Sequence, residues 1–140
     1  MLFRSVHAPA LAQIATGSAV YLFQFSRMDF SSALAEVFGN EHVIKAGIAL
    51  DRDLVDLRKL FPFEARNFLD LGDVAKRQGM KQTGVRNLTG LFLGGRITKS
   101  MQTSNWAQPR LTEKQLRYAA TDAWVCRELY VKFEKLGLLP

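Results

Sequence analysis

The segment Tyr118-Ala119-Ala120-Thr121-Asp122-Ala123-Trp124 stands inside the clearest helical pattern of the chain. Thr112-Glu113-Lys114-Gln115 fits a capping box that opens this helix, and Gly137 is a natural stop for it. Because Tyr118 and Asp122 are four residues apart, a phenol and a carboxylate share one helix face. Such a pair can orient a water molecule, but taken alone it is more often an ordinary surface hydrogen bond.

Apolar runs and turn residues upstream of this helix predict alternating strands and helices. Residues 10–15 and 19–25 flank a turn-rich tripeptide and predict a β-hairpin. Residues 42–48 predict a buried strand, and the leucines after it predict a helix that ends before Pro62. The remaining expected elements are a short helix capped by Ser31 or Ser32, a strand or strand-to-helix entry at residues 67–74, and a helix at residues 85–93. This order indicates an α/β domain with a mixed sheet.

Length and composition limit the class of protein. The 140 residues, at 15.8 kDa, fit one domain over residues 1–140 and are too few for two. The sequence has no run approaching the ~18 apolar residues of a membrane span and no signal-peptide pattern, so we expect a cytoplasmic protein, or a nuclear one in a eukaryote. One cysteine, Cys126, and two histidines exclude a Cys/His metal cluster, so any metal must bind oxygen ligands.

Positive charge is concentrated in the second half of the chain. Residues 76–117 contain nine basic residues against one acid, a local charge of +8, whereas the whole chain carries +6. Such a segment suits a polyanion such as nucleic acid, and the alternative is a solvated basic face without a ligand. Arg96, Lys99 and Arg110 are the cations expected to contact phosphates, with Arg86 next.

Three stretches around the C-terminal helix together carry a resemblance to a known family. They are KSMQTSNW at residues 99–106, RLT at 110–112 and YAATDAW at 118–124. In this combination they resemble the third exonuclease motif of the DEDDy-type 3′-5′ exonucleases, which include ribonuclease D and the Werner-type exonuclease domain. KAGIALDRD at residues 45–53 resembles the second motif, with Asp53 in the aspartate position. The resemblance covers the chain from about Ala8 to its C-terminus.

The resemblance implies a ribonuclease H-like fold, with a mixed sheet flanked by helices, and removal of nucleotides from the 3′ ends of DNA or RNA. It also implies two divalent metal ions, Mg²⁺ or Mn²⁺, both of which prefer oxygen ligands. By this resemblance Asp53 and Asp122 bind metal and Tyr118 positions the attacking water. It places three loop residues near the substrate: Ser104, Asn105 and Trp106. Core packing is an equally suitable role for Trp106.

The family's first motif, an Asp-x-Glu on the opening strand, has no counterpart here, because the first acid of the chain is Asp29. In the family's arrangement that strand lies in the middle of the sheet. We therefore expect the central strand to be missing and two ladders of backbone groups to be left unpaired. Three explanations are open: an N-terminally incomplete domain, which we favour; a strand supplied by another chain or an oligomer; and a fold that closes around the gap.

These observations predict a metal-dependent 3′-5′ exonuclease domain that is impaired, because Asp53 and Asp122 lack the Asp-x-Glu pair. The alternatives are a non-catalytic nucleic-acid-binding module and an adaptor subunit whose sheet edge pairs with a partner strand. Other acids suit simpler roles. Asp51 suits the positive end of a helix dipole, while Asp70 and Asp73 suit either a supporting carboxylate near the site or a solvated loop.

Overall fold

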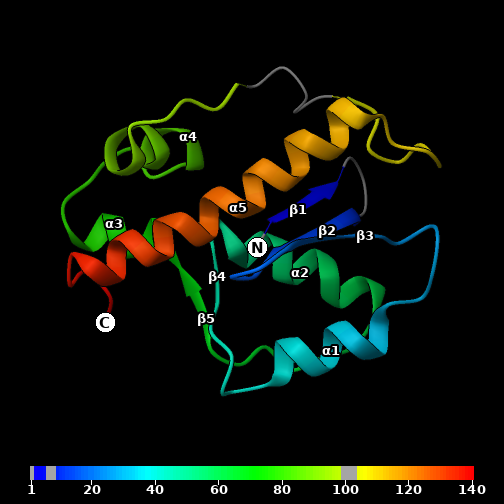
Figure 1. Cartoon of the computed structure of the whole chain (residues 1–140). Coiled ribbons are helices and arrows are strands. Elements are labelled where there is room, and N and C mark those ends of the chain that lie inside the picture. Colours follow the sequence, from blue (N-terminus) through cyan, green and yellow to red (C-terminus); the bar gives the residue numbers. More distant parts are fainter. Residues whose placement is uncertain (1, 6–8, 99–103) are drawn as a thin grey trace.

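The N-terminal strands form an antiparallel sheet. The computed structural model describes residues 2–5, 9–98 and 104–140. Its first three strands are β1 (Leu2–Ser5), β2 (Pro9–Ala15) and β3 (Val20–Gln24), in the order β1-β2-β3 (Figure 1). β2 and β3 confirm the predicted hairpin, and its turn is closed by the Thr16 N–H, which donates to Ala19 O at 2.8 Å.

A second sheet pairs β4 (Lys45–Gly47) with β5 (Phe68–Asp70) in parallel. The chain connects them through a helix, which is the crossover that parallel strands require. Within the described residues no strand joins β1 or β2 to β4, so the sheet is divided where a missing central strand was expected. β1 pairs with the edge of β2 that faces away from β3, with Leu2 opposite Gln13, so one of the two ladders expected to be unpaired is partly paired. The sequence of β1, LFRS, contributes no carboxylate.

The helices follow the predicted order. They are α1 (Ser31–Gly39), α2 (Leu50–Leu60), α3 (Leu71–Arg77), α4 (Val85–Leu88), the π-helix η1 (Thr89–Leu93) and α5 (Glu113–Lys135). The predicted capping box is present at Thr112. Gly137 follows α5 with φ of 70°, a left-handed conformation that glycine adopts without strain. No helix in the described part of the chain is long and apolar enough to cross a membrane.

The start of α1 differs from the prediction. Its N-cap is Phe30, and neither Ser31 nor Ser32 supplies a side-chain cap. Asp29 takes this role, because its Oδ1 accepts the Ser31 N–H at 2.9 Å. The pKa of the Asp29 carboxyl is lowered first by a hydrogen bond with the Ser31 side chain and then by this bond from the Ser31 N–H.

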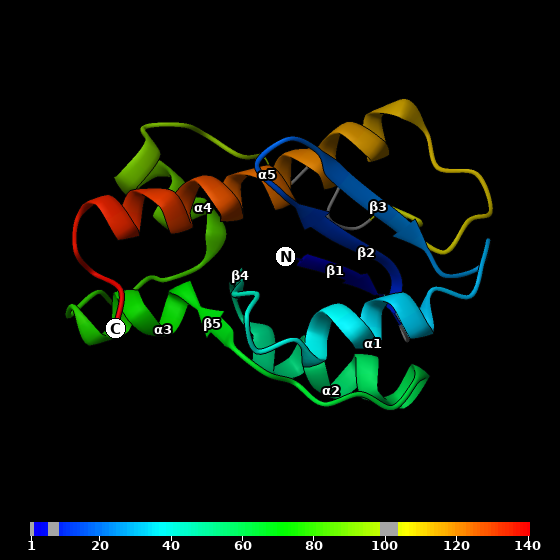
Figure 2. The same ribbon diagram turned by 60° about the horizontal axis from the view of Figure 1, so that its bottom comes forward.

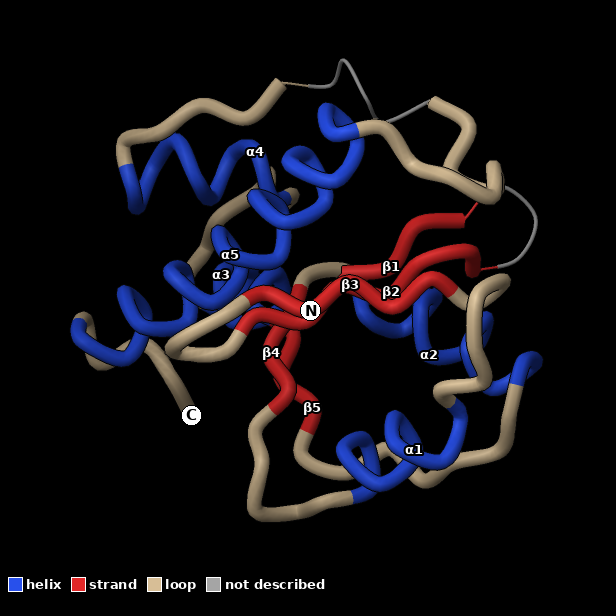
Figure 3. The backbone as a smooth tube through the Cα atoms, turned by 45° about the vertical axis from the view of Figure 1, so that its right-hand side comes forward, coloured by secondary structure: helices blue, strands red, loops and turns tan. Residues whose placement is uncertain are grey.

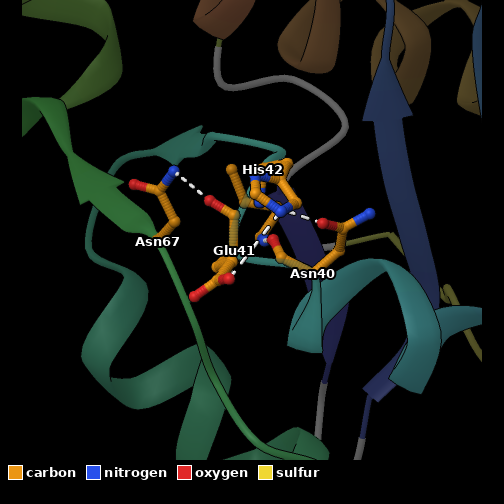
Figure 4. Close-up of polar contacts among 5 residues, drawn as sticks. Asn40, Glu41, His42 and Asn67 are labelled. Atoms are coloured by element: carbon orange, nitrogen blue, oxygen red, sulfur yellow. Dashed lines mark hydrogen bonds and ion pairs between the residues drawn. The ribbon is translucent and has the colours of Figure 1, made fainter.

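The strand expected at residues 42–48 is shorter in the structure, where β4 begins at Lys45. The preceding residues form a loop held by polar contacts (Figure 4). The His42 N–H donates to Asn40 Oδ1 at 2.9 Å, and Asn67 Nδ2 donates to Glu41 O at 3.0 Å. These bonds satisfy backbone groups that a longer strand would have paired, and they tie the start of β4 to the start of β5.

The strands lie between α5 on one side and α1 with α2 on the other (Figures 2 and 3). The N-terminal half of α5 packs on β2, where Ala119 and Leu11 are at most 1% exposed. Its C-terminal half packs against α3 and α4 through Leu129 and Phe133, which are fully buried. α1 and α2 share a third apolar cluster that includes Phe38 and the partly buried side chains of the hairpin. The long helix α5 therefore positions its side chains relative to both sheets.

Candidate active site

A capped N-terminus fixes the start of the helix that carries Tyr118 and Asp122. Thr112 Oγ1 accepts the Gln115 N–H at 3.1 Å, and Gln115 Oε1 accepts the Thr112 N–H at 2.9 Å. This reciprocal pair satisfies donors that a helix otherwise leaves open. Asp122 lies two turns further along and is 2% exposed, while Tyr118 is half-buried.

A buried hydrogen bond joins this helix to the hairpin. Gln13 Nε2, on β2, donates to Ala119 O at 2.8 Å, and the Gln13 side chain has no exposed surface. Ala119 follows Tyr118 directly in the sequence. The bond therefore helps to fix the position of this part of α5 along β2 and its rotation about the helix axis. Sequence reasoning missed Gln13, and its only signal was a polar residue at an inward position of an apolar strand.

The loop before α5 is tied down on both sides. Gln115 Nε2 donates to Ser104 Oγ at 3.0 Å and to Asn105 O at 3.1 Å, and its side chain is buried. On the other side, Gln24 Nε2 at the end of β3 donates to Gln108 O at 2.9 Å. The loop predicted to approach the substrate is therefore held between the hairpin and α5.

Trp106 lies in the core of this region. Its side chain is 1% exposed and packs with Leu11, Leu111 and Ala119. Its ring centroid is 6.2 Å from that of Tyr118. Because almost none of the indole reaches the surface, it offers no face on which a base can stack, and the core-packing alternative describes its place.

Asp53 lies in the first turn of α2, directly after β4, as its position in the second motif implies. Burial raises the pKa of this carboxyl to about 7, and the neighbouring carboxylates of Asp56 and Asp70 add to the shift. The exposed Asp51 shares the first turn, where a negative charge faces the positive end of the helix dipole.

Asp70 is a supporting residue that the sequence left undecided between two roles. Its Oδ2 accepts the Leu50 N–H at 3.0 Å, at the start of α2, and its Oδ1 accepts the Gly72 N–H at 2.8 Å, at the start of α3. The N-cap of α2 is Ala49, a left-handed residue with φ of 58° and no polar side chain. One carboxylate therefore caps two helices and holds the turn that carries Asp53.

Replacing Asp70 with alanine is expected to lower the free energy of unfolding by about 2 kcal/mol, because two helix starts lose a charged acceptor. Urea unfolding followed by circular dichroism measures the change. Asp73→Ala is the control, since Asp73 is exposed and its loss should cost less than about 1 kcal/mol. Equal losses for the two variants would contradict the double-capping role.

The two helices that carry the predicted metal ligands meet at one strand, because both α2 and α5 contact β1. In the described part of the chain, however, no group of three or more His, Cys, Asp or Glu side chains is placed to hold a metal ion. Asp53 and Asp122 suit Mg²⁺ or Mn²⁺ in kind, but two carboxylates bring only two negative charges toward two divalent ions. The described residues therefore do not by themselves fit a two-ion site.

The predicted phosphate-binding cations are exposed where the structure describes them. Arg96 lies in the connection after η1 and Arg110 in the loop before α5, and both are exposed. Lys99 lies outside the described residues. Asn105 is exposed and Ser104 is half-buried. Arg110 lies two residues before Thr112, the N-cap of α5, at the end of the helix that carries Tyr118.

Comparison with known proteins agrees with this arrangement. Residues 4–137 match a family described as 3′-5′ exonuclease. The chain belongs to this 3′-5′ exonuclease family. The resemblance to DEDDy-type exonucleases and the ribonuclease H-like fold are thereby confirmed.

Individual relatives of this exonuclease domain show the same relationship. The bifunctional 3′-5′ exonuclease/ATP-dependent helicase WRN of Mus musculus is 36% identical over 126 residues, which are 86% of this chain and 9% of WRN. The crystal structure of the Aedes aegypti Nibbler EXO domain superposes with a TM-score of 0.84 at 29% identity, covering 95% of this chain and 74% of that one. The domain spans only 9% to 34% of the first three curated relatives.

A more distant relative carries ligands. NrnC of Brucella melitensis with bound Mg²⁺ superposes with a TM-score of 0.78 at 20% identity, covering 94% of this chain and 67% of that one. NrnC has also been solved bound to pGG. At this identity the likeness supports the fold of the exonuclease domain.

Proposed function

We propose that this exonuclease domain acts on the 3′ ends of DNA or RNA and that the 140 residues alone are impaired in hydrolysis. Tyr118 is the residue proposed to orient the attacking water, with Asp53 and Asp122 as carboxylates of a site for two Mg²⁺ or Mn²⁺ ions. The observation that carries this proposal is the convergence of α2 and α5 on β1, which bears no acid. The proposed compartment is the cytoplasm, or the nucleus in a eukaryote.

The impairment follows from charge. A phosphodiester and two divalent ions require several oxygen ligands, and hydrolysis depends on both ions being held in place. Asp53 lies on α2 and Asp122 lies on α5. The strand β1 contacts both helices, but its sequence contains neither an Asp nor a Glu. Because β1 and β3 already flank β2, an Asp-x-Glu pair from a segment other than β1 would be needed to complete the proposed ligand set.

Degradation and binding of a 3′-labelled single-stranded oligonucleotide test this proposal in the same samples. We expect salt-sensitive binding with no detectable shortening in Mg²⁺ or Mn²⁺. Stepwise shortening that Asp122→Ala abolishes would overturn the impairment while supporting the exonuclease assignment. A folded sample that neither binds nor shortens the oligonucleotide would overturn the nucleic-acid function.

A groove beside the divided sheet favours a second candidate, an adaptor that accepts a partner strand. The groove has a volume of about 440 Å³ and lies between the hairpin, α1 and β4. Four of its apolar side chains are 38% to 50% exposed: Tyr21, Val37, Val43 and Ile44. A strand added beside β4 would cover them and pair open backbone groups. A monomer by light scattering at high concentration would count against self-association through this groove.

A further inference from the structure

A long stretch of this domain contains bases and no acids. Residues 74–112 include no Asp or Glu. Among the residues that the structure describes, six cations in this stretch are exposed and form no ion pair: Lys76, Arg77, Lys81, Arg86, Arg96 and Arg110. A cation without an ion-pair partner keeps more of its attraction for an anionic ligand.

Some cations elsewhere on the surface are paired, although Arg58 and Lys132, for example, form no ion pair among the described residues. Lys59 lies 3.8 Å from a carboxylate oxygen of Asp56, and Arg66 pairs with Glu64. These pairs are the usual arrangement of a solvated charged face. The six cations form no such pair, although Asp73 lies three and four residues before Lys76 and Arg77 on α3, and this excess of positive charge favours an anionic ligand over a solvated face.

The six cations do not form one patch. Arg110 lies at the N-terminal end of α5, close in sequence to Tyr118, whereas α3 and α4 pack against the C-terminal half of the helix around Phe133. We name Lys76, Arg77, Lys81 and Arg86, on α3, α4 and the turn between them, the far cations. Arg96 lies on the connection that runs from α4 back toward the start of α5 (Figure 1).

The length of α5 gives an estimate of the distance between Tyr118 and the far cations. Tyr118 and Phe133 are fifteen residues apart on α5, which corresponds to about 22 Å at 1.5 Å per residue. Phosphates of one stacked strand follow each other at about 3.4 Å along the axis, so about six or seven nucleotides cover that length. A dinucleotide, such as the pGG found in NrnC, would not reach from one end to the other.

We propose that the far cations bind backbone phosphates of a single strand of nucleic acid whose 3′ end lies at Tyr118. This inference rests on the proposed function and adds a substrate class to it: oligonucleotides of more than about six nucleotides rather than dinucleotides. The strand passes Arg96 on its way along α5. Because the contacts are to phosphates, they favour length without selecting a base sequence.

The chain offers a matched pair of variants. Lys76 and Arg77 are adjacent bases in the last turn of α3, and Arg58 and Lys59 are adjacent bases in the last turn of α2. All four residues are exposed, but Arg58 also lies over the Phe63 ring at 5.4 Å, so circular dichroism is used to check that each double alanine variant keeps the fold. Fluorescence anisotropy with 4-nucleotide and 16-nucleotide single strands, at several salt concentrations, compares the variants with the unaltered chain.

We expect Lys76→Ala/Arg77→Ala to weaken binding of the 16-nucleotide strand by about five- to tenfold and to reduce the salt slope by about 1.4, or 0.7 for each lost phosphate contact. Binding of the 4-nucleotide strand should not change, and Arg58→Ala/Lys59→Ala should leave both affinities unchanged. An equal loss for both strand lengths, or for both double variants, would overturn the inference. If the unaltered chain binds neither length, the proposed function fails instead.

Discussion

Trp106→Ala is expected to lower the free energy of unfolding by about 3–5 kcal/mol, the range for removing a large aromatic side chain from a core. The indole is 1% exposed and fills the space between the hairpin and the start of α5. Small domains are stable by only about 5–15 kcal/mol, so this loss is a large share of the total. Urea unfolding followed by circular dichroism at 25 °C gives the value directly.

The second tryptophan provides the control for this prediction. Trp124 lies on α5 and is 51% exposed, whereas Trp106 lies in the loop before that helix. Trp124→Ala should change the free energy of unfolding by less than about 1 kcal/mol, as surface substitutions usually do. Equal decreases in the free energy of unfolding for Trp106→Ala and Trp124→Ala would show that Trp106 is not a core residue. Trp106→Phe should keep oligonucleotide affinity, because almost none of the Trp106 side chain is exposed to a ligand.

Asp53→Asn is expected to stabilise the domain at pH 8 by about 2 kcal/mol and to leave it unchanged near pH 3, since a shift of three pKa units corresponds to at most about 4 kcal/mol. Burial raises the pKa of Asp53 from 3.8 to about 7 in the folded state. The folded state therefore holds this proton more tightly than the unfolded chain. Stability from this group is fully present below pH 3.8 and is lost as the pH rises toward 7.

Urea unfolding at pH 3, 5 and 8, without divalent metal, separates this contribution from others. In the unaltered chain the free energy of unfolding should fall between pH 5 and pH 8, and Asp53→Asn should remove most of that fall. Asp51→Asn, an exposed change in the same helical turn, should retain the pH dependence of the unaltered chain. If the Asp53 and Asp51 variants behave alike, burial does not govern the Asp53 carboxyl.

Local patterns predicted most of the elements because they depend on neighbouring residues. The capping box at Thr112, the stop at Gly137 and the hairpin turn all use contacts within a few positions of the chain. The wrong N-cap of α1 and the short β4 have a different cause. At the start of α1, the Asp29 carboxylate accepts the Ser31 N–H, so no serine hydroxyl caps the helix. Before β4, side-chain hydrogen bonds of Asn40 and Asn67 satisfy backbone groups in a loop, so the strand begins later than expected.

The candidate site likewise has features that the sequence predicted and features that depend on how helices and strands pack. The motif around Tyr118 and Asp122 was visible in the sequence, and so was the absence of an Asp-x-Glu. The roles of Gln13, Asp70 and Gln115 were not, because each binds a backbone group or side chain whose approach depends on how helices and strands pack.

The sequence by itself determined the family, the order of strands and helices, and the residues able to perform nuclease chemistry, since these follow from residue type and short spacing. Only the tertiary structure decided that Trp106 is core, that one Asp70 carboxylate caps two helices, and that the basic residues separate to opposite ends of α5. Burial and charge separation depend on distances in space, and a linear sequence does not contain those distances.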